Sequence, residues 1–487
     1  MKIYNITKPL TILATGLLLL TSCENFLDVE PNSQVKGDEL FQTEAGFKEA
    51  LAGVYTSMIN NNNYAKEMRF GLIGVIGAEW DYYPTTSYQD ASLYQYDQTV
   101  PKGMINSLWS SMYNSIANVN NIIANIQTRQ DVFTGGNYSI IKGEAYGLRA
   151  LLHFDLLRCF GVSYAVDSTK ASIPYYTEIV KGSFPQLKVH QVMDKVLADL
   201  DTAELCLLND PIKTGEIIDE LNDNGYLINR QVHFNYYAVK ALKARAYMWK
   251  GDYTNAKLCA KEVVNSSAFS WSTQENIMKG LDNSYAPEQI FGLNHEKLSN
   301  VADNYFNPDQ LSASFNLEVG TIETLYDNDT DDYRFAYTFT SGKDAYTNRR
   351  FIKKYNSPAL SQNSTSNESS AASFGANKMS IIRLSEMHLI LSECEYMANS
   401  FYVLDGINSI RSARGLKILT RDPEDYYSTL INEYKKEFLG EGVMFFLYKR
   451  LNIDMLPNSS ESIVAAKGYT FPIPDSEKES AIREENR

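Results

Sequence analysis

The stretch that decides the fold is AVKALKARAYMWKGDYTNAKLCAKEVV, residues 238–264. It matches the small and aromatic positions of a tetratricopeptide helix pair at Ala244, Tyr247, Gly251-Asp252-Tyr253, Ala256 and Ala260. A glycine turn between two helices that carry small residues lets those helices pack closely in antiparallel orientation. A weaker match at 384–414 indicates a few irregular repeats rather than a regular array.

Apolar residues recur every three or four positions along much of the chain, which is typical of amphipathic helices. The clearest stripe runs from Ile105 to Ile126. The same period predicts helices near 142–160, 190–207, 236–249, 254–264, 381–398, 403–413 and 426–449. The predicted fold class is therefore mainly α, with irregular tetratricopeptide-like helical repeats, long loop insertions and a few short strands.

Four segments interrupt this helical pattern. Residues 60–104 are rich in Asn, Gly, Tyr and Asp with little periodicity, and Ser357–Ser373 is a Ser/Asn run, so both are predicted surface loops. Residues 288–294 have the apolar content of a strand. The segment 296–312 that follows is then expected to be an excursion from the helical body.

The N-terminus carries the signature of a bacterial lipoprotein. Leu20-Thr21-Ser22-Cys23 follows an apolar segment, Leu10–Leu20, that is too short to span a bilayer but suits a signal peptide. We expect residues 1–22 to be removed and Cys23 to carry the lipid, since each buried acyl methylene contributes about 0.8 kcal/mol of membrane affinity. The alternative is an ordinary secretory signal followed by a chance cysteine.

Composition limits the possible partners and cofactors. A formal net charge of −14 argues against nucleic acid and against a polybasic membrane surface. Cys159, Cys206, Cys259 and Cys394 lie far apart without CxxC spacing, so we interpret them as small hydrophobes rather than as disulfide or metal-binding residues. The histidines lack HExxH spacing, and the sequence predicts neither a metal site nor a cofactor.

Several blocks of sequence carry a resemblance to a known family. Phe26-Leu27-Asp28-Val29-Glu30-Pro31, directly after Cys23, resembles the opening of the SusD/RagB family of Bacteroidetes outer-membrane lipoproteins. Further blocks agree in order: Gly143-Glu144-Ala145, Leu148-Arg149-Ala150, Phe154–Arg158, Arg383–Glu386, Arg414-Gly415-Leu416, Glu433–Glu437, Glu441-Gly442, Lys449-Arg450 and Phe471-Pro472-Ile473-Pro474. Val443 and Met444 stand where the family often has histidine and arginine, which indicates a subfamily difference.

The resemblance implies a nutrient-binding role at the cell surface. SusD-like proteins act as lids over a SusC-like TonB-dependent transporter and capture a nutrient, usually an oligosaccharide. We therefore expect a lipid-anchored outer-membrane protein that faces the exterior, with a glycan ligand and this transporter as partners. The expected organisation is a signal peptide at 1–22, an N-terminal SusD-like region at 23–220 and a repeat and C-terminal region at 221–487, packed as one body.

A sugar site needs aromatic faces for stacking and polar groups for the hydroxyls. The chain has 33 tyrosines, more than its 22 phenylalanines. Trp80, Asp81, Tyr82 and Tyr83 supply both kinds of group within one poorly periodic segment. Family ligand sites also use a loop after the central repeats, where Tyr305 and Phe306 are the matching aromatics.

Each of these aromatic residues has a structural alternative. Trp80 could be a buried anchor for its own loop. Of Tyr82 and Tyr83, only one can point to a given face of an extended segment.

Other functions remain open. The ligand could be a peptide or another non-glycan nutrient. A surface glycosidase needs only two carboxylates about 5–10 Å apart, but no nucleophile motif is present, so the sequence favours a protein that is not an enzyme. A scaffold that merely holds the transporter is a third possibility.

Overall fold

The structure is a computed structural model that describes residues 39–179, 182–218, 225–356, 365, 367–369, 375–454 and 468–487. The predicted signal peptide, the lipid-attachment residue Cys23 and the block Phe26–Pro31 lie outside the described residues. Most of the predicted loop Ser357–Ser373 lies outside them as well.

Helices dominate the described residues, which confirms the predicted fold class. The helices that form the body are α3 (Glu44–Met58), α6 (Thr99–Ile126), α7 (Asn137–Phe160), α9 (Val189–Cys206), α11 (Tyr236–Lys250), α12 (Tyr253–Val264), α18 (Leu384–Met397), α19 (Asp405–Ala413), α20 (Tyr426–Phe438) and α21 (Met444–Leu451). Shorter helices and 3-10 turns lie between them, including α4 (Leu72–Ile76), α5 (Thr85–Ser92), α14 (Leu298–Tyr305), α15 (Val319–Leu325), α16 (Tyr333–Tyr337) and α23 (Asp475–Ser480).

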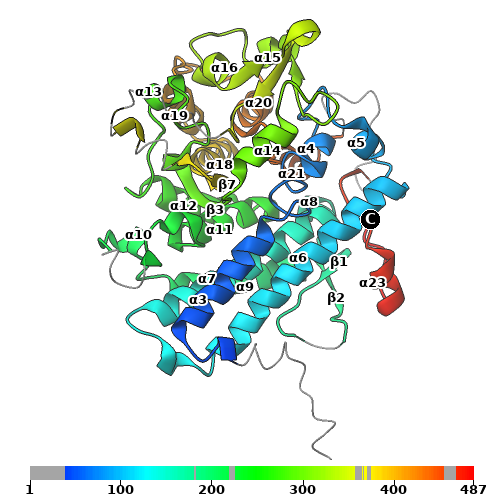
Figure 1. The fold of residues 1–487 in the computed structure, drawn as a ribbon, viewed down its shortest axis with the longest axis vertical. Coiled ribbons are helices and arrows are strands. Elements are labelled where there is room, and N and C mark those ends of the chain that lie inside the picture. The colour runs from blue at the N-terminus through cyan, green and yellow to red at the C-terminus, as the bar shows by residue number, and fades with distance from the viewer. Residues whose placement is uncertain are drawn as a thin grey trace, which may run out of the picture.

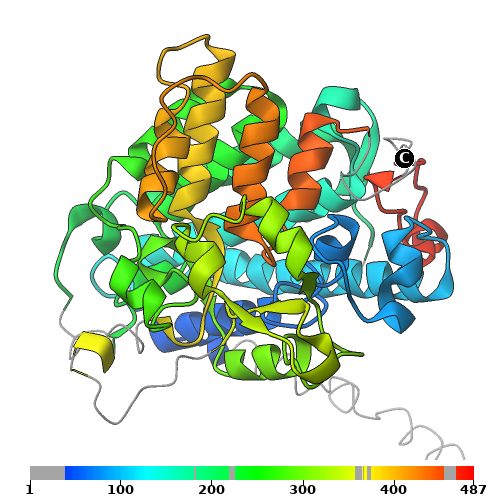
Figure 2. The ribbon, with the colours of Figure 1, turned by 90° about the horizontal axis from the view of Figure 1, so that it is seen from above.

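The long helices pack in sequence order, each against its neighbours. Helix α7 contacts α6 and α9, α11 contacts α9 and α12, α12 contacts α18, and α18 contacts α19 (Figure 1). In the second view the C-terminal helices, coloured gold to orange, stand side by side, with axes that cross that of α6 (Figure 2). This arrangement is the irregular helical stack that the repeat pattern predicts.

The helix pair at 238–264 has the predicted turn. Gly251 ends α11 in the left-handed region with φ +75°, where a side chain would be strained. Asp252 then begins α12, and its side chain accepts a hydrogen bond from the backbone N of Asn255 at 3.1 Å. Ala256 and Ala260 are fully buried in the helix contact. Small residues therefore allow the close approach that the sequence indicated.

In the part of the chain that the structure describes, seven short strands form three small antiparallel sheets. β3 (Gln289–Asn294) pairs with β7 (Lys378–Arg383), and β1 (Ala171–Pro174) pairs with β2 (Gln186–Lys188). β6 (Arg349–Ile352) lies between β4 (Leu317–Glu318) and β5 (Phe339–Ser341). The predicted strand at 288–294 is confirmed. Because β7 runs directly into α18, the helix predicted from 381 begins at Leu384 instead.

The helix predicted at 426–449 is divided into α20 and α21. Gly440 and Gly442 between them have φ +78° and +70°, which ends one helix and turns the chain toward the next. A side chain at Gly442 would lie 2.6 Å from the backbone of Arg69, so the close approach requires glycine. The helical period alone did not reveal this break.

Residues 60–104 are not a surface loop, and that prediction is wrong for most of the segment. Phe70, Leu72 and Ile73 are fully buried, and the segment contains α4, α5 and the start of α6. Its helices are too short to show a period, and its tyrosine hydroxyls form hydrogen bonds within the protein. It forms part of the hydrophobic core that extends from Phe41 to Ile473.

A buried network of charged side chains joins β7 and α20 with the residue before β3 and the residue after α19. Arg383 donates to the Oε1 of Glu437 at 2.6 Å and to the Oε1 of Glu441 at 2.9 Å. Arg414 donates to Glu288 Oε2 at 2.7 Å and to Glu437 Oε1 at 2.6 Å. The side chains of Arg383, Arg414, Glu288 and Glu437 are all fully buried. The blocks that carry the family resemblance are therefore held together by ion pairs.

Candidate functional site

Trp80 and Phe306 lie in the core, so neither is the exposed stacking platform that was one interpretation of the sequence. Trp80 is 4% exposed and Phe306 3% exposed. The indole Nε1 of Trp80 donates to the carbonyl of Phe70 at 2.9 Å, and its ring packs against Phe306 and Phe315. The alternative interpretation, a buried anchor for its own segment, matches this placement.

Asp81 and Tyr82 lie half-buried beside β4. The backbone of Tyr82 forms an isolated antiparallel bridge with Asn316, and the carboxylate of Asp81 accepts from the backbone N of Glu318 at 2.8 Å. The Tyr82 hydroxyl donates to the carboxylate of Glu318, and the guanidinium of Arg349 lies 3.8 Å from the Tyr82 ring centre. One face of this ring is thus already covered by a cation.

Tyr83 and Tyr305 are half-buried at two other places. The Tyr83 hydroxyl donates to Ser92 Oγ at 2.8 Å. The Tyr305 ring lies 5.4 Å from that of Phe70, with the Lys66 ammonium 5.5 Å from its centre. The six predicted ligand residues therefore do not converge on one exposed surface. A role in ligand binding stays a prediction for the four that are partly exposed, Asp81, Tyr82, Tyr83 and Tyr305.

A groove of about 650 Å³ opens next to Asp81 and Tyr82. It lies between the end of α4, the β4–α15 segment and the helices α20 and α21, which Figure 1 shows close together. Its lining is mixed polar and apolar: Gly77, Ala78, Glu79, Leu317, Glu318, Gly320, Thr321, Thr324, Leu325, Asp327, Asn432, Lys435, Leu439, Met444 and Tyr448. The volume is within the range of small-molecule sites.

Two of the segments that line the groove carry residues in the left-handed region. Ala78 has φ +53° and Asp327 has φ +56°. Both are unusual for residues with a side chain, and such conformations persist where the surrounding structure holds them. On one wall, the turn at Ala78 leads directly to Glu79. On the other, Asp327 is paired with Lys436 at 3.0 Å.

Glu79 and Tyr448 are the most buried polar side chains of the groove, 4% and 1% exposed. The Oε2 of Glu79 accepts from the backbone N of Gly440 at 2.8 Å. Burial raises the pKa of Glu79 to about 7, although hydrogen bonds from the backbone and the charge of Lys354 act in the opposite direction. Burial and the nearby Glu79 also raise the pKa of Tyr448 above its ordinary value.

The sequence interpretation missed most of this groove. Glu79 stands one residue before the predicted Trp80, and Glu318 is joined to Asp81 and Tyr82 by hydrogen bonds. The other lining residues come from 77–78, 317–327 and 432–448. The aromatic residues of the last segment follow the helical period, so they gave no local sign of a site. The sequence pointed only to the wall formed by the end of α4, because the segment that follows α4 is both polar and aromatic.

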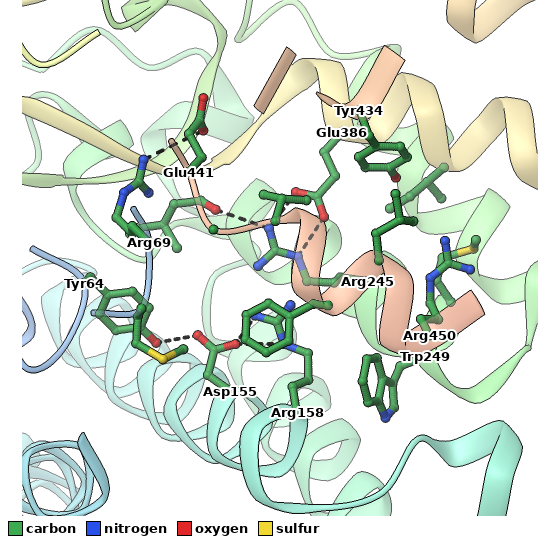
Figure 3. Close-up of a pocket in the computed structure, with 18 residues that line it drawn as sticks. Tyr64, Arg69, Asp155, Arg158, Arg245, Trp249, Glu386, Tyr434, Glu441 and Arg450 are labelled. Atoms are coloured by element: carbon green, nitrogen blue, oxygen red, sulfur yellow. Dashed lines mark hydrogen bonds and ion pairs between the residues drawn. The ribbon is translucent and has the colours of Figure 1, made fainter. Parts of the chain in front are cut away.

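A second cavity, of about 70 Å³, lies in the interior (Figure 3). It has room for a few water molecules and not for a sugar ring. In Figure 3, Tyr64 donates to Asp155 at 2.5 Å and Arg245 donates to Glu386 at 2.8 Å. Each of its four arginines has a carboxylate partner: Arg158 with Asp155, Arg245 with Glu386, Arg450 with Glu393 and Arg69 with Glu441. Paired charges in so small a space indicate a structural role.

The cysteine thiols do not indicate an alternative site within the described residues. Cys159 and Cys394 are buried free thiols, as predicted, while the free thiols Cys206 and Cys259 are half-buried. Over the same part of the chain, none of the helices combines the length and the apolar character that crossing a bilayer requires.

Comparisons with known proteins agree with the sequence blocks. The family model described as "Starch-binding associating with outer membrane" matches residues 25–248, and the model described as "SusD family" matches residues 282–482. Two SusD-like proteins of Formosa agariphila are 25% identical over 288 residues and 23% identical over 305 residues. These alignments cover 58% and 61% of this chain but 49% and 48% of the relatives. The chain thus spans about half the length of the curated relatives it matches.

Solved structures share the fold. A SusD-like carbohydrate binding protein from Bacteroides vulgatus is 18% identical, with a TM-score of 0.71 over 90% of this chain and 96% of that one. A SusD superfamily protein from Bacteroides thetaiotaomicron is 19% identical, with a TM-score of 0.70 over 91% and 100%. A protein described as a laminarin binding SusD-like protein is 16% identical, with a TM-score of 0.65 over 91% and 99%. With the fold shared and both family models matched in order along its length, the chain belongs to the SusD/RagB family.

Proposed function

We propose that this chain is a cell-surface lipoprotein that binds an oligosaccharide or polysaccharide and passes it to a SusC-like TonB-dependent outer-membrane transporter. The groove beside α4 is the observation that carries the ligand part of this proposal. Its 650 Å³ volume and mixed lining suit a sugar, which presents hydroxyls at its edge and apolar C–H groups on its faces.

In this proposal, the predicted residues Asp81 and Tyr82 contribute to ligand binding at the rim of this groove. Both are joined by hydrogen bonds to Glu318, which lines it. Tyr83 and Tyr305 lie at two other places and would contact only a longer glycan. Trp80 supports the rim from the core. In this arrangement the protein binds its ligand without cleaving it.

A glycan-binding panel tests this function. The Cys23→Ala protein, which is not acylated, is titrated calorimetrically with neutral, cationic and anionic oligosaccharides and with short peptides. Laminarin oligosaccharides come first, because one structure of the same fold is described as laminarin binding. We expect at least one oligosaccharide to bind, and chromatography to recover it intact. Hydrolysis would favour the glycosidase alternative, and binding of peptides alone would contradict the glycan assignment.

The transporter part of the proposal rests on family membership and on the predicted anchor at Cys23. We expect the tagged wild-type protein, extracted from membranes in mild detergent, to copurify with a large TonB-dependent barrel. An unrelated acylated lipoprotein with the same tag is the control for barrels carried along by detergent micelles. Recovery of the tagged protein without any barrel would contradict the lid model and leave the glycan assignment untouched.

A further inference from the structure

One lysine of the groove has no carboxylate partner in the described part of the chain. Lys435 lies on α20, is half-buried and lines the groove. Its neighbour Lys436, in contrast, pairs with Asp327 at 3.0 Å. Burial lowers the pKa of Lys435, and no nearby carboxylate raises it. Burial of a charge is unfavourable unless the charge is paired, so an ammonium without a counterion in a groove needs an explanation.

The carboxyl groups that line the groove each have another cation nearby or are partly neutral. Asp327 is paired with Lys436. Glu318 is the register partner of Arg349, whose guanidinium lies 3.8 Å from the centre of the tyrosine ring that donates to Glu318. The burial that raises the pKa of Glu79 to about 7 leaves this carboxyl partly protonated at neutral pH. The lysine on α20 therefore carries the unbalanced charge of the lining.

Hydroxyl and amide groups line the groove together with this lysine. Thr321 and Thr324 are three residues apart on α15, and Asn432 and Lys435 are three residues apart on α20, so each pair shares one face of its helix. The two helices are in contact, and all four side chains line the groove. Within the described residues, the side chains of the two threonines and of Asn432 are not engaged by other groups. They are donors available to a ligand.

We propose that Lys435 and these three polar side chains bind an acidic substituent of the glycan, either a uronate carboxylate or a sulfate ester. This inference rests on the proposed glycan binding and names the ligand class. Both acidic groups carry several anionic oxygens, which can accept from an ammonium, a hydroxyl and an amide at once. In a half-buried groove the attraction between opposite charges is stronger than in bulk water. The ligand then supplies the missing counterion.

Neutral and cationic sugars fit this wall less well. A sugar hydroxyl can accept a hydrogen bond from Lys435, but it leaves the half-buried charge uncompensated. An amino sugar would place a second ammonium beside the first, where like charges repel.

Two matched pairs of hexasaccharides test the role of charge by isothermal titration. Alginate hexasaccharide is compared with the same oligosaccharide after reduction of its carboxyl groups to hydroxyls, and a κ-carrageenan hexasaccharide with its desulfated form. We expect the wild type to bind at least one acidic member about tenfold or more tightly than its neutral counterpart, as for one charge-assisted hydrogen bond. The pair that shows this preference distinguishes a carboxylate from a sulfate.

Salt provides a second measurement on the same wild-type protein. Raising the ionic strength from about 0.1 M to about 1 M shortens the Debye length from about 10 Å to about 3 Å. The affinity for the acidic hexasaccharide should fall, and the affinity for the neutral counterpart should not.

Lys435→Met removes the charge and keeps an unbranched side chain. We expect the affinity for the acidic hexasaccharide to fall about tenfold and that for the neutral counterpart to stay within about twofold. The melting temperature should not fall, because the ammonium has no carboxylate partner among the described residues to lose. Lys435→Arg keeps the charge and should retain most of the affinity. Lys417→Met is the matched control, since Lys417 is exposed and outside the groove lining. It should bind like the wild type.

Equal affinity for both members of both pairs would overturn the proposal, and so would an equal loss of affinity in Lys435→Met and Lys417→Met. Preference for a chitosan hexasaccharide would overturn it as well. If Lys435→Met does not fold, the two wild-type measurements still decide. Absence of binding to every glycan of the wider panel would contradict the proposed function itself, whereas binding of neutral glycans alone contradicts only the acidic subsite.

Discussion

Arg383→Met should lower the free energy of unfolding by about 3–5 kcal/mol, the largest effect that we expect from a single substitution. The side chain of Arg383 is fully buried and donates to the carboxylates of Glu437 and Glu441 and to the carbonyl of Glu437. Its loss leaves buried carboxylates without their compensating charge. Urea unfolding followed by circular dichroism measures the change.

Arg421→Met is the control for this variant, because Arg421 is exposed and its replacement should change stability by less than about 0.5 kcal/mol. A loss below about 1 kcal/mol in Arg383→Met would show that the network contributes little to stability.

The same network predicts how stability depends on acid. Although burial raises the pKa of Glu441, the charges of Arg383, Lys354 and Arg69 outweigh it and lower the pKa to about 2. A carboxyl whose pKa is lower in the folded state stabilises the protein above its unfolded pKa of 4.5 and loses that contribution as the pH falls toward 2. Arg383→Met should therefore unfold at a higher pH than the wild type in an acid titration.

Trp80→Ala should also destabilise the protein by about 3–5 kcal/mol, because it leaves a cavity among Phe70, Phe306 and Phe315 and removes the hydrogen bond from the indole. Any loss of glycan binding would follow from unfolding or from movement of the groove wall. Thermal melting and calorimetry on the same sample separate the two effects.

The control is Leu93→Ala, in the same segment but 59% exposed, which should melt within a few degrees of the wild type. If Trp80→Ala kept the wild-type melting temperature and lost glycan binding, Trp80 would be a ligand contact after all.

The helical repeats could be predicted from sequence because their signals are local. Gly251, Asp252 and the small residues after them specify a turn, a cap and a close helix contact within one short stretch. The groove could not be predicted in the same way. Its walls come from three segments, 77–79, 317–327 and 432–448, that are each more than 100 residues apart in the chain, and Glu79 becomes notable only because the fold buries it beside Tyr448.

The aromatic segment 80–83 lies next to the observed groove, and its role in ligand binding stays a prediction. Composition does not indicate which of its side chains point inward. Trp80 packs into the core while Asp81 and Tyr82 reach Glu318 at the rim. Trp80 points inward because it contacts Phe306 and Phe315, which are distant in the sequence. A local sequence pattern cannot reveal such contacts.

The most direct test of the central claim, that the groove beside α4 holds the glycan, is the glycan affinity of Gly320→Trp compared with that of Gly53→Trp. Gly320 lines the groove, and a side chain built there meets no atom within 4 Å, so an indole can occupy the groove without straining the fold. Gly53 is an equally unobstructed, exposed glycine on α3, away from the groove. Isothermal titration with the tightest-binding panel glycan should show at least about a hundredfold loss of affinity for Gly320→Trp, as for a truncated hot spot, and wild-type affinity for Gly53→Trp. Equal affinity in the two variants, with both folded, would contradict the groove as the ligand site.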